Sequence, residues 1–336
     1  MIKTSDGTVN YNYLHILRFS ACFAVILLHY SGSFTYRIGI PTFNTGIQFF
    51  TITRWCVPVF LMVSGALLLD KYQEPLQFYK KRLLRILPPF LFWSAVYIGF
   101  KLFRHEIELN AVPQMLIAGG AEFHLWYVYM ILGIILFLPF LTPWTEKKNK
   151  KSILLFLMIW IYWLVFSNQY GQAAVALDLT CFGGYIGYLV LGYYLHILPS
   201  KKYHWMIGVG LFCIGLVYSY YSSIELSYQL KEFSGSNQRY LSWNVLLMSA
   251  GVFLVAKQLV LPSRVLAVVK EVAKYSFSIY LAHIFVRDSL VKNYFDFPAL
   301  DFYSFLLLKT LFVMLFSYVL ARALSLVPFA GRFISG

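Results

Sequence analysis

The run Y-L-H-I-L-R-F-S-A-C-F-A-V-I-L-L-H-Y-S-G-S occupies residues 13–33. Most of these residues are apolar or small, and Arg18 carries the one formal charge among them. A helix needs about 20 mostly apolar residues to cross the hydrocarbon core of a bilayer. No small-residue cleavage pattern follows the run, so we interpret it as a retained transmembrane helix and not as a signal peptide.

The composition of the whole chain agrees with this interpretation. Among 336 residues, 60% are hydrophobic and only 12% are charged, whereas soluble domains carry about 25% charged residues. The mean hydropathy is +0.66. These values exclude a disordered chain, a secreted disulfide scaffold and an ordinary cytosolic enzyme. They predict a multi-pass membrane protein of the all-α class.

Apolar runs recur along the entire chain, with no long polar stretch between them that could form a separate soluble domain. We therefore expect one membrane-embedded domain over residues 1–336. The hydropathy pattern predicts about ten transmembrane helices. Their ranges are 13–33, 47–69, 88–104, 124–142, 152–167, 179–198, 205–223, 241–261, 275–291 and 303–327.

The net charge is +14, and the placement of the charges explains it. If the N-terminus is cytoplasmic and each loop is counted with the helix ends that adjoin it, the inner segments hold 18 basic and five acidic residues. The outer segments then hold seven basic and nine acidic residues. Basic residues concentrate on the cytoplasmic side of membrane proteins. The excess thus indicates ten spans with both termini in the cytoplasm of a plasma (inner) membrane, and nucleic acid is not expected as a partner. Three basic residues remain within spans after the loops and the adjoining helix ends are counted: Arg18, Arg54 and Lys309.

Sequence patterns for metal binding and for common catalytic loops are missing. The chain contains no GxxxxGK[ST], G-x-S-x-G or HExxH pattern. Its four cysteines lie in apolar stretches without histidines at metal-ligand spacing, which is typical of small buried hydrophobic residues. No metal site is expected. The cysteines are Cys22, Cys56, Cys181 and Cys213.

Arg18 and His29 stand out because a charged side chain within a membrane usually faces a cavity or a partner. They are eleven residues apart, which brings them within about 20° of one another around a helix and about 16 Å apart along it. Both side chains therefore lie on one stripe, with the cation nearer the inner side and the imidazole nearer the outer side. Each residue alone also fits a simpler role, a snorkelling arginine or a packing histidine.

Arg54 lies in the second expected span, ahead of Pro58 and the pair Ser64-Gly65. Proline and small residues permit a bend and a close approach of helices. We regard Arg54 as a candidate for substrate binding.

A basic stretch, F-Y-K-K-R-L-L-R-I-L-P-P, covers residues 78–89 before the third expected span. It fits an anchor to anionic membrane lipid. It also fits a cradle for a polyanionic cytoplasmic ligand, formed by Lys81, Arg82 and Arg85. Arg82 and Arg85 are three residues apart on one helical face, so together they could grip one phosphate group.

The fourth and ninth expected spans carry further polar candidates for substrate binding. Glu122, His124 and Trp126 open the fourth span on its outer side. This cluster fits an aromatic belt at the interface, or a rim that handles sugars or protons. His283 falls in the ninth span. There it either faces the cavity that Arg18 and His29 are expected to line, or serves only in packing.

Five segments of this sequence, taken together, resemble acyltransferase family 3 of bacterial integral-membrane proteins over nearly the whole chain. The first is the R-x10-H pattern of Arg18 and His29. The others are F-L-M-V-S-G-A-L-L in the second span, K-R-L-L-R-I after it, H-L-W-Y at 124–127 and S-I-Y-L-A-H at 278–283. They occur in the family's order.

This resemblance implies an O-acyltransferase that moves an acetyl group from cytoplasmic acetyl-CoA to a sugar hydroxyl of a surface or lipid-linked glycan of the cell envelope. It implies His29 as the catalytic histidine and Arg18 as a partner of the donor. Arg82 and Arg85 would belong to the inner acyl-CoA site. The expected partners are thus acyl-CoA, a glycan or lipid-linked sugar, and membrane lipid.

Alternatives stay open at this stage. A membrane transporter or flippase for a glycan or its precursor would also use many spans and buried charges. A structural subunit of a glycan-synthesis complex is a third class. For a transferase, His29 could act as a general base or form a covalent acyl-histidine. The sequence identifies neither the group that orients His29 nor the oligomeric state, a homo-oligomer included.

Overall fold

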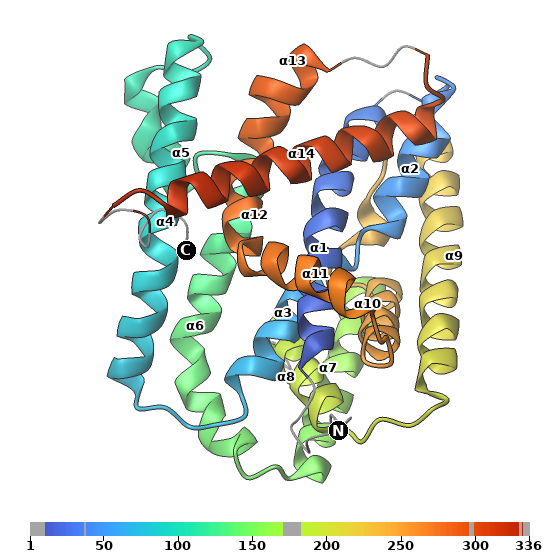
Figure 1. Cartoon of the computed structure of the whole chain (residues 1–336). Helices are drawn as coiled ribbons and strands as arrows, with labels where there is room; N and C mark the ends of the chain where they lie inside the picture. The colour runs from blue at the N-terminus through green and yellow to red at the C-terminus, as the bar shows by residue number, and fades with distance from the viewer. Residues whose placement is uncertain (1–10, 37, 171–182, 296–298, 329–330, 332–336) are drawn as a thin grey trace. The chain divides into compact units, whose positions relative to one another are not determined.

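The computed structural model describes residues 11–36, 38–170, 183–295, 299–328 and 331. Helices are the only regular secondary structure among these residues, so the all-α class is confirmed (Figure 1). The α-helices are α1 (Asn12–Ser31), α2 (Thr42–Ile52), α3 (Cys56–Leu68), α4 (Pro75–Phe103), α5 (Val112–Ile117), α6 (Trp126–Thr145), α7 (Lys150–Tyr170), α8 (Ile186–Ile197), α9 (His204–Leu230), α10 (Trp243–Ala256), α11 (Ser263–Lys274), α12 (Ser276–Val286), α13 (Lys292–Tyr294) and α14 (Phe302–Ser325).

Seven helical segments in the described part of the chain are long and apolar enough to cross a membrane. Each corresponds to one of the ten expected spans, which confirms the multi-pass character of the chain. These segments are Asn12–Phe34, Thr42–Leu68, Pro75–Phe103, Phe123–Thr145, His204–Leu230, Ser236–Ala256 and Phe302–Ser325.

The other three expected spans also contain helices. The expected 152–167 lies within α7, and the expected 275–291 contains α12 followed by a π-helical turn, Arg287–Val291. The expected 179–198 contains α8, while residues 179–182 fall outside the described residues. The number of ten spans and the cytoplasmic position of both termini therefore stay predictions.

Two local features differ from the sequence-based expectation. The second span consists of two helices, because a turn at Thr53–Trp55 separates α2 from α3. The basic stretch 78–89 is the first half of the 29-residue helix α4, which continues through Pro88 and Pro89. Proline removes one backbone hydrogen-bond donor but does not always end a helix in a membrane, where neighbouring groups can satisfy the freed carbonyl.

The helices group into two compact units, each built from separate stretches of the chain. Unit 1 comprises Met1–Lys71, Trp144–Lys274 and Phe297–Thr310. Unit 2 comprises Tyr72–Pro143, Tyr275–Asp296 and Leu311–Gly336.

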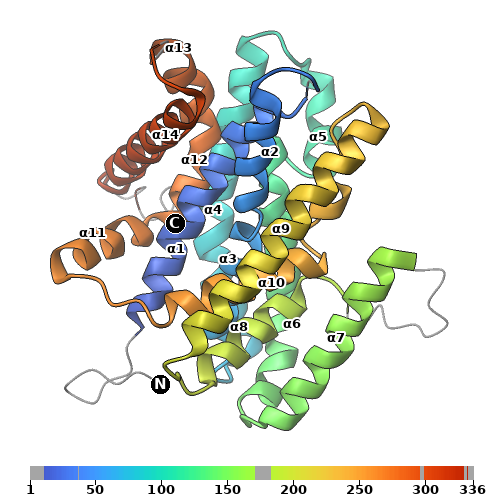
Figure 2. The same ribbon diagram turned by 90° about the vertical axis from the view of Figure 1, so that its right-hand side faces the viewer.

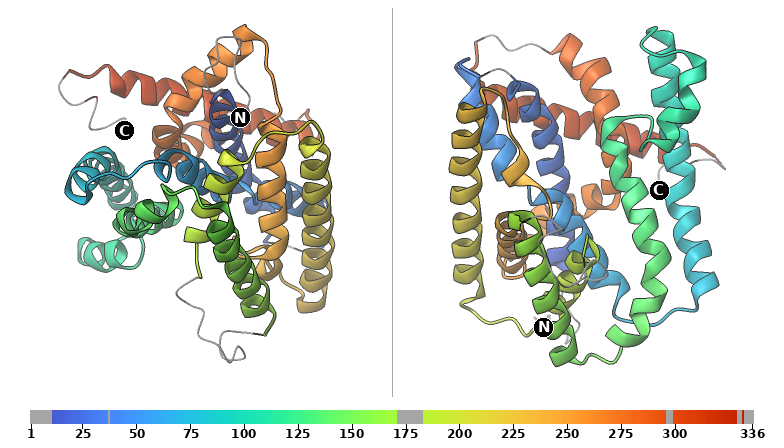
Figure 3. Two further views of the ribbon diagram at one scale, coloured as in Figure 1. Left: turned by 90° about the horizontal axis from the view of Figure 1, so that it is seen from below. Right: turned by 180° about the vertical axis from the view of Figure 1, so that it is seen from behind.

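Close helix packing through glycine holds unit 1 together. A Cβ atom added at Gly65 on α3 would lie 1.9 Å from the Leu189 carbonyl oxygen on α8, so only glycine fits there. Helices α9 and α10 also pack against each other along their length, as Figures 2 and 3 show. Small residues at helix contacts permit this approach in membranes, where apolar side chains gain little by leaving lipid.

Unit 2 is built around α4, α6 and α12. The Tyr97 hydroxyl on α4 donates to the Leu281 carbonyl on α12 over 2.8 Å, and it accepts from the Phe285 backbone N–H over 3.1 Å. These two bonds join α4 to α12 at a buried point, since Tyr97 and Leu281 are both buried.

Candidate functional site

Arg18 and His29 lie on the part of α1 that is not fully covered. Most residues of α1 are buried, including the residues directly before both side chains, Leu17 and Leu28. Arg18 and His29 are themselves partly exposed. The helix is continuous between them, so their expected spacing of about 20° around the axis and about 16 Å along it holds in the structure.

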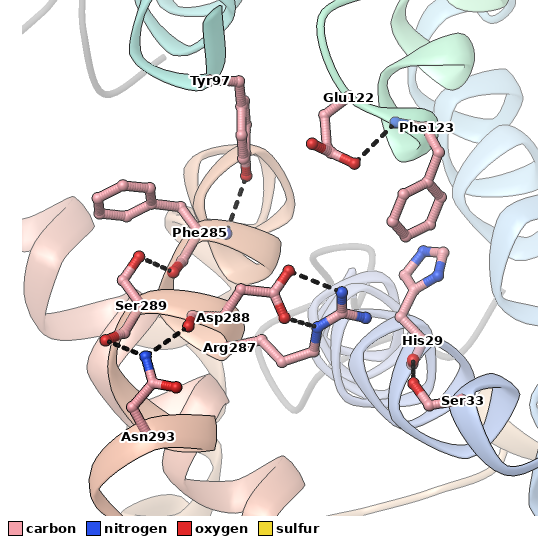
Figure 4. A network of polar contacts seen from close by, with 10 residues as sticks. All are labelled: His29, Ser33, Tyr97, Glu122, Phe123, Phe285, Arg287, Asp288, Ser289 and Asn293. Carbon is pink, nitrogen blue, oxygen red and sulfur yellow. Dashed lines mark hydrogen bonds and ion pairs between the residues drawn. The ribbon is translucent and has the colours of Figure 1, made fainter. Parts of the chain in front are cut away.

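His29 occupies the last turn of α1. Its backbone carbonyl accepts a 3.5 Å hydrogen bond from the Ser33 hydroxyl in the following 3-10 turn, Gly32–Phe34 (Figure 4). The structure thus places an imidazole at one end of the partly exposed face of α1 and the Arg18 guanidinium toward the other.

His15 belongs to the same face but was missed by the sequence analysis. It is partly exposed and lies one helical turn before Arg18. Arg18 and Lys270 both act on its ring electrostatically, and Lys270 comes from α11, which packs against α1. The spacing of three residues from Arg18 could have identified His15, whereas the contribution of α11 needed the tertiary structure.

Arg54, also in unit 1, lies in the turn between α2 and α3. Its Nε donates to the Gln238 carbonyl over 2.7 Å. The guanidinium carbon lies 4.0 Å from the centre of the Tyr240 ring and 5.0 Å from that of Phe50. Within the part of the chain that the structure describes, no carboxylate forms an ion pair with Arg54. The arginine is therefore held by rings and a carbonyl, not by a counter-ion.

Gln238 is fully buried, and its side chain fixes the loop that contacts Arg54. Its Nε2 donates to the Thr51 hydroxyl over 2.8 Å and to the Ser223 hydroxyl over 2.7 Å. The Tyr188 hydroxyl donates to the Tyr240 carbonyl over 2.5 Å. These bonds connect α2, α8 and α9 to the loop before α10, which positions both partners of Arg54.

The basic residues of α4 are in unit 2 and face different surroundings. Lys81 and Arg85 are exposed, and Arg82 is partly buried. The Arg82 guanidinium lies 5.7 Å from the centre of the Phe78 ring. Arg82 and Arg85 remain one turn apart on one continuous helix. This spacing suits a shared phosphate group.

His124 and His283 come together in the core of unit 2. Both are buried, and their rings meet edge to face with 4.9 Å between their centres. The Tyr280 hydroxyl donates to the His124 carbonyl. His283 Nδ1 lies 2.6 Å from the Tyr280 carbonyl. Because a carbonyl only accepts, His283 Nδ1 carries a proton in this bond.

Glu122 and Trp126 lie just before α6 and at its first residue. Glu122 forms a 3.0 Å ion pair with Lys101, and it accepts from the Phe123 backbone N–H over 3.2 Å (Figure 4). Trp126 begins α6 and lies against Tyr127, with 6.4 Å between the ring centres. His124, by contrast, is buried and not part of an exposed rim.

An ion pair that the sequence analysis did not use follows α12. Both Nε and Nη2 of Arg287 donate to the Asp288 carboxylate over 2.8 Å (Figure 4). The Arg287 guanidinium also lies 6.0 Å from the centre of the Phe123 ring. Two adjacent charges in an expected span thus neutralise each other, which explains how the apolar run tolerates them.

The candidate residues are therefore divided between the two units. Unit 1 brings together Arg18, His29 and Arg54, with His15 and Lys270 added by the structure. The remaining candidates all belong to unit 2: Lys81, Arg82, Arg85, Glu122, His124, Trp126 and His283.

Long apolar helices with polar and charged residues inside them define a multi-pass membrane protein. The family model for the acyltransferase domain of acyltransferase family 3 matches residues 11–322. The chain therefore belongs to acyltransferase family 3, as its five sequence segments indicated. No curated protein and no solved structure matches the chain.

Proposed function

We propose that the chain transfers an acetyl group from cytoplasmic acetyl-CoA to a sugar hydroxyl of a surface or lipid-linked glycan. The observation that carries this proposal is the pair Arg18 and His29 on the partly exposed face of α1, in a chain of acyltransferase family 3. An imidazole and a guanidinium on one face are a base and a charge-stabilising group, which acyl transfer to a hydroxyl requires.

The proposed topology has ten spans, both termini in the cytoplasm, and the inner (plasma) membrane as its location. The seven long apolar helices support the multi-pass arrangement, and the concentration of basic residues in alternate loops supports the orientation. In this topology the Arg18 end of α1 is nearer the cytoplasm and the His29 end is nearer the outside.

In the proposed reaction, neutral His29 removes the proton from the sugar hydroxyl as its oxygen attacks the thioester carbonyl carbon. The new C–O bond forms and the C–S bond breaks, and the imidazolium then returns the proton to the departing thiolate. Arg18 stabilises negative charge on the donor during this step. In the covalent alternative, His29 itself receives the acetyl group before the sugar does.

The donor is proposed to enter from the cytoplasmic side, where Lys81, Arg82 and Arg85 hold its phosphates. The i,i+3 spacing of the two arginines on α4 supports this role. Coenzyme A carries a compact polyanionic end and a long thin arm, so a basic site at the membrane surface can hold one end while the thioester reaches inward.

Mass spectrometry of surface glycans tests the proposal directly. We expect glycans from cells with the wild-type chain to carry one acetyl group more than glycans from cells with His29→Asn. His105→Asn is the matched control, since His105 is exposed and its positive φ of 55° suits asparagine. Equal acetylation with wild-type and His29→Asn protein would contradict the assignment.

A transporter or flippase for a glycan precursor is the second candidate function. The turn at Thr53–Trp55 favours it, because interrupted helices form substrate sites in many transporters. Purified protein in lipid vesicles separates the two functions. Acetyl transfer that depends on acetyl-CoA supports the transferase, and glycan movement without acetyl-CoA supports the transporter.

A further inference from the structure

Two interruptions of regular helix meet at Arg54. One is the turn at Thr53–Trp55 between α2 and α3. The other is the loop 231–242 between α9 and α10, whose Gln238 reaches back to Ser219 and Ser223 of α9. Those serines lie about 10–16 Å before the end of α9 at Leu230, given the helical rise per residue. Irregular backbone at membrane depth is tolerated where protein buries it or where it lines a polar cavity.

The guanidinium of Arg54 is held so that one edge stays available. Its Nε donates to the Gln238 carbonyl, and the rings of Tyr240 and Phe50 lie against the guanidinium. Among the described residues, its terminal nitrogens Nη1 and Nη2 donate to no protein group and form no ion pair. These two nitrogens form the planar pair of donors that binds a carboxylate or phosphate with two parallel hydrogen bonds.

The surroundings fix this orientation in advance. Gln238 is fully buried and bound to two hydroxyls, and Tyr240 is held through its carbonyl by Tyr188. A preorganised arginine loses less side-chain entropy when it binds an anion than a flexible one does. The surroundings thus hold the guanidinium in a fixed orientation through its Nε and the two rings.

The loop that contacts Arg54 enters at the same end of unit 1 as His29. The loop that carries Gln238 and Tyr240 follows the C-terminal end of α9. Near that end of α9, Tyr228 donates to Asn44 at the start of α2 and packs against Phe43. Phe34, which follows α1, lies within 3.3 Å of a Cβ built at Gly46 on α2. The end of α1 that bears His29 is thus at the end of unit 1 where the loop enters.

We propose that Arg54 is an oxyanion-binding site for the acceptor, and that the acceptor therefore carries a carboxylate or phosphate group near the hydroxyl to be acylated. This inference rests on the proposed function, because Arg54 would bind the acceptor of the proposed acyl transfer. An acidic sugar and a lipid-linked sugar phosphate share this chemistry. Tyr240 and Phe50 then supply flat apolar faces beside the anion, as in many sites for charged sugars.

A binding experiment on purified protein in uncharged (phosphatidylcholine) nanodiscs tests the inference. The probes are glucuronic acid with its neutral counterpart glucose, and farnesyl phosphate with its neutral counterpart farnesol. We expect one acidic probe to bind the wild type, with its neutral counterpart and Arg54→Gln each weakening binding about 10- to 100-fold. Glucuronic acid identifies an acidic sugar, and farnesyl phosphate identifies a lipid phosphate.

Arg239→Gln is the matched control. Arg239 is exposed on the same loop, and its substitution removes the same charge as Arg54→Gln does. It should bind the acidic probe as the wild type does. Arg54→Lys keeps the charge but loses the paired donors, so its affinity should lie between those of the wild type and Arg54→Gln. The comparison of acidic with neutral probes uses the wild-type protein. It therefore tests whether an anionic acceptor binds even if Arg54→Gln folds poorly.

The inference is overturned if neither acidic probe binds, if neutral probes bind equally well, or if Arg54→Gln binds like the wild type. It is also overturned if acetyl-CoA is the one anion whose binding depends on Arg54, because the site would then belong to the donor. Failure of the proposed function is a separate outcome. In that case acidic probes bind through Arg54 while acetylation of glycans does not depend on His29.

Discussion

The rings of His124 and His283 meet edge to face in the core of unit 2, with 4.9 Å between their centres. Tyr280 contacts both residues, through its hydroxyl to the His124 carbonyl and through its own carbonyl to His283 Nδ1. Two histidines that are far apart in sequence are thus joined by one tyrosine. This arrangement first of all stabilises unit 2, and it suggests the first prediction.

Replacing His283 with alanine should destabilise unit 2. The substitution leaves a cavity in a fully buried place and removes the bond to the Tyr280 carbonyl. We expect a loss of about 2–4 kcal/mol, measured as a lower thermal midpoint in detergent. His105→Asn, at an exposed position, should unfold like the wild type. An unchanged midpoint for His283→Ala would show that the contact contributes nothing to folding.

Replacing Arg18 should impair catalysis more than folding. Arg18→Ala should lower kcat/KM for acetyl transfer by about 10²- to 10³-fold, the usual effect of removing one group that stabilises developing charge. Arg18→Lys should keep part of the rate because it retains a cation. Arg264→Ala, which removes an exposed arginine from α11, should keep the wild-type rate. Equal rates for Arg18→Ala and wild type would remove Arg18 from the mechanism.

The double variant Arg82→Ala/Arg85→Ala should raise the apparent KM for acetyl-CoA. Each charged hydrogen bond to phosphate contributes about 1.5–3 kcal/mol, so the pair should weaken donor binding at least about tenfold. Lys150→Ala/Lys151→Ala removes two exposed charges at the start of α7 and serves as the control. If both doubles leave KM unchanged, the basic part of α4 is an anchor to lipid.

Lys257 should be required for the stability of unit 1. Its Nζ donates to the carbonyls of Leu195, His196 and Leu198 at the C-terminal end of α8, over 2.6, 3.1 and 2.5 Å. Lys257→Met would leave these carbonyls without their donor and should cost about 1–3 kcal/mol. Limited proteolysis should then cleave the variant faster. Lys202→Met, at an exposed lysine shortly after the end of α8, should be cleaved at the wild-type rate.

Gly65 should not tolerate even one additional methyl group. An alanine Cβ there would lie 1.9 Å from the Leu189 carbonyl oxygen, so α3 and α8 would have to separate. Gly99→Ala on α4 is the matched control, because a Cβ at Gly99 meets nothing within 4 Å. We expect Gly65→Ala to reduce the yield of folded protein sharply in size-exclusion chromatography. Gly99→Ala should equal or slightly exceed the wild type, since alanine favours helix.

The sequence alone predicted the features that depend on local composition. Hydropathy identified the long helices, because a span of about 20 apolar residues is a strong signal. The spacing of Arg18 and His29 followed from helical periodicity within one unbroken helix. The interruption at Thr53–Trp55 was not predicted, because neither glycine nor proline occurs at that turn and Pro58 lies inside α3.

Contacts between distant segments were beyond the reach of the sequence. The Arg54 partners Gln238 and Tyr240 are some 180 residues away and lie in a loop that hydropathy assigns to the membrane surface. His124 was expected at an exposed rim because aromatic residues surround it, whereas those same rings bury it. An aromatic cluster at a membrane interface has the same composition as one in a protein core. Composition alone therefore cannot distinguish these two locations.

The packing of α1 has a consequence for biosynthesis. Helix α1 is synthesised long before α11, the helix against which it packs. Until then the face of α1 with His15 and Arg18 lacks Lys270 and its neighbours. Contacts so far apart in sequence form slowly. A chain truncated before α11 should therefore expose α1 to quality-control proteases, so the truncation would remove the helices before it as well.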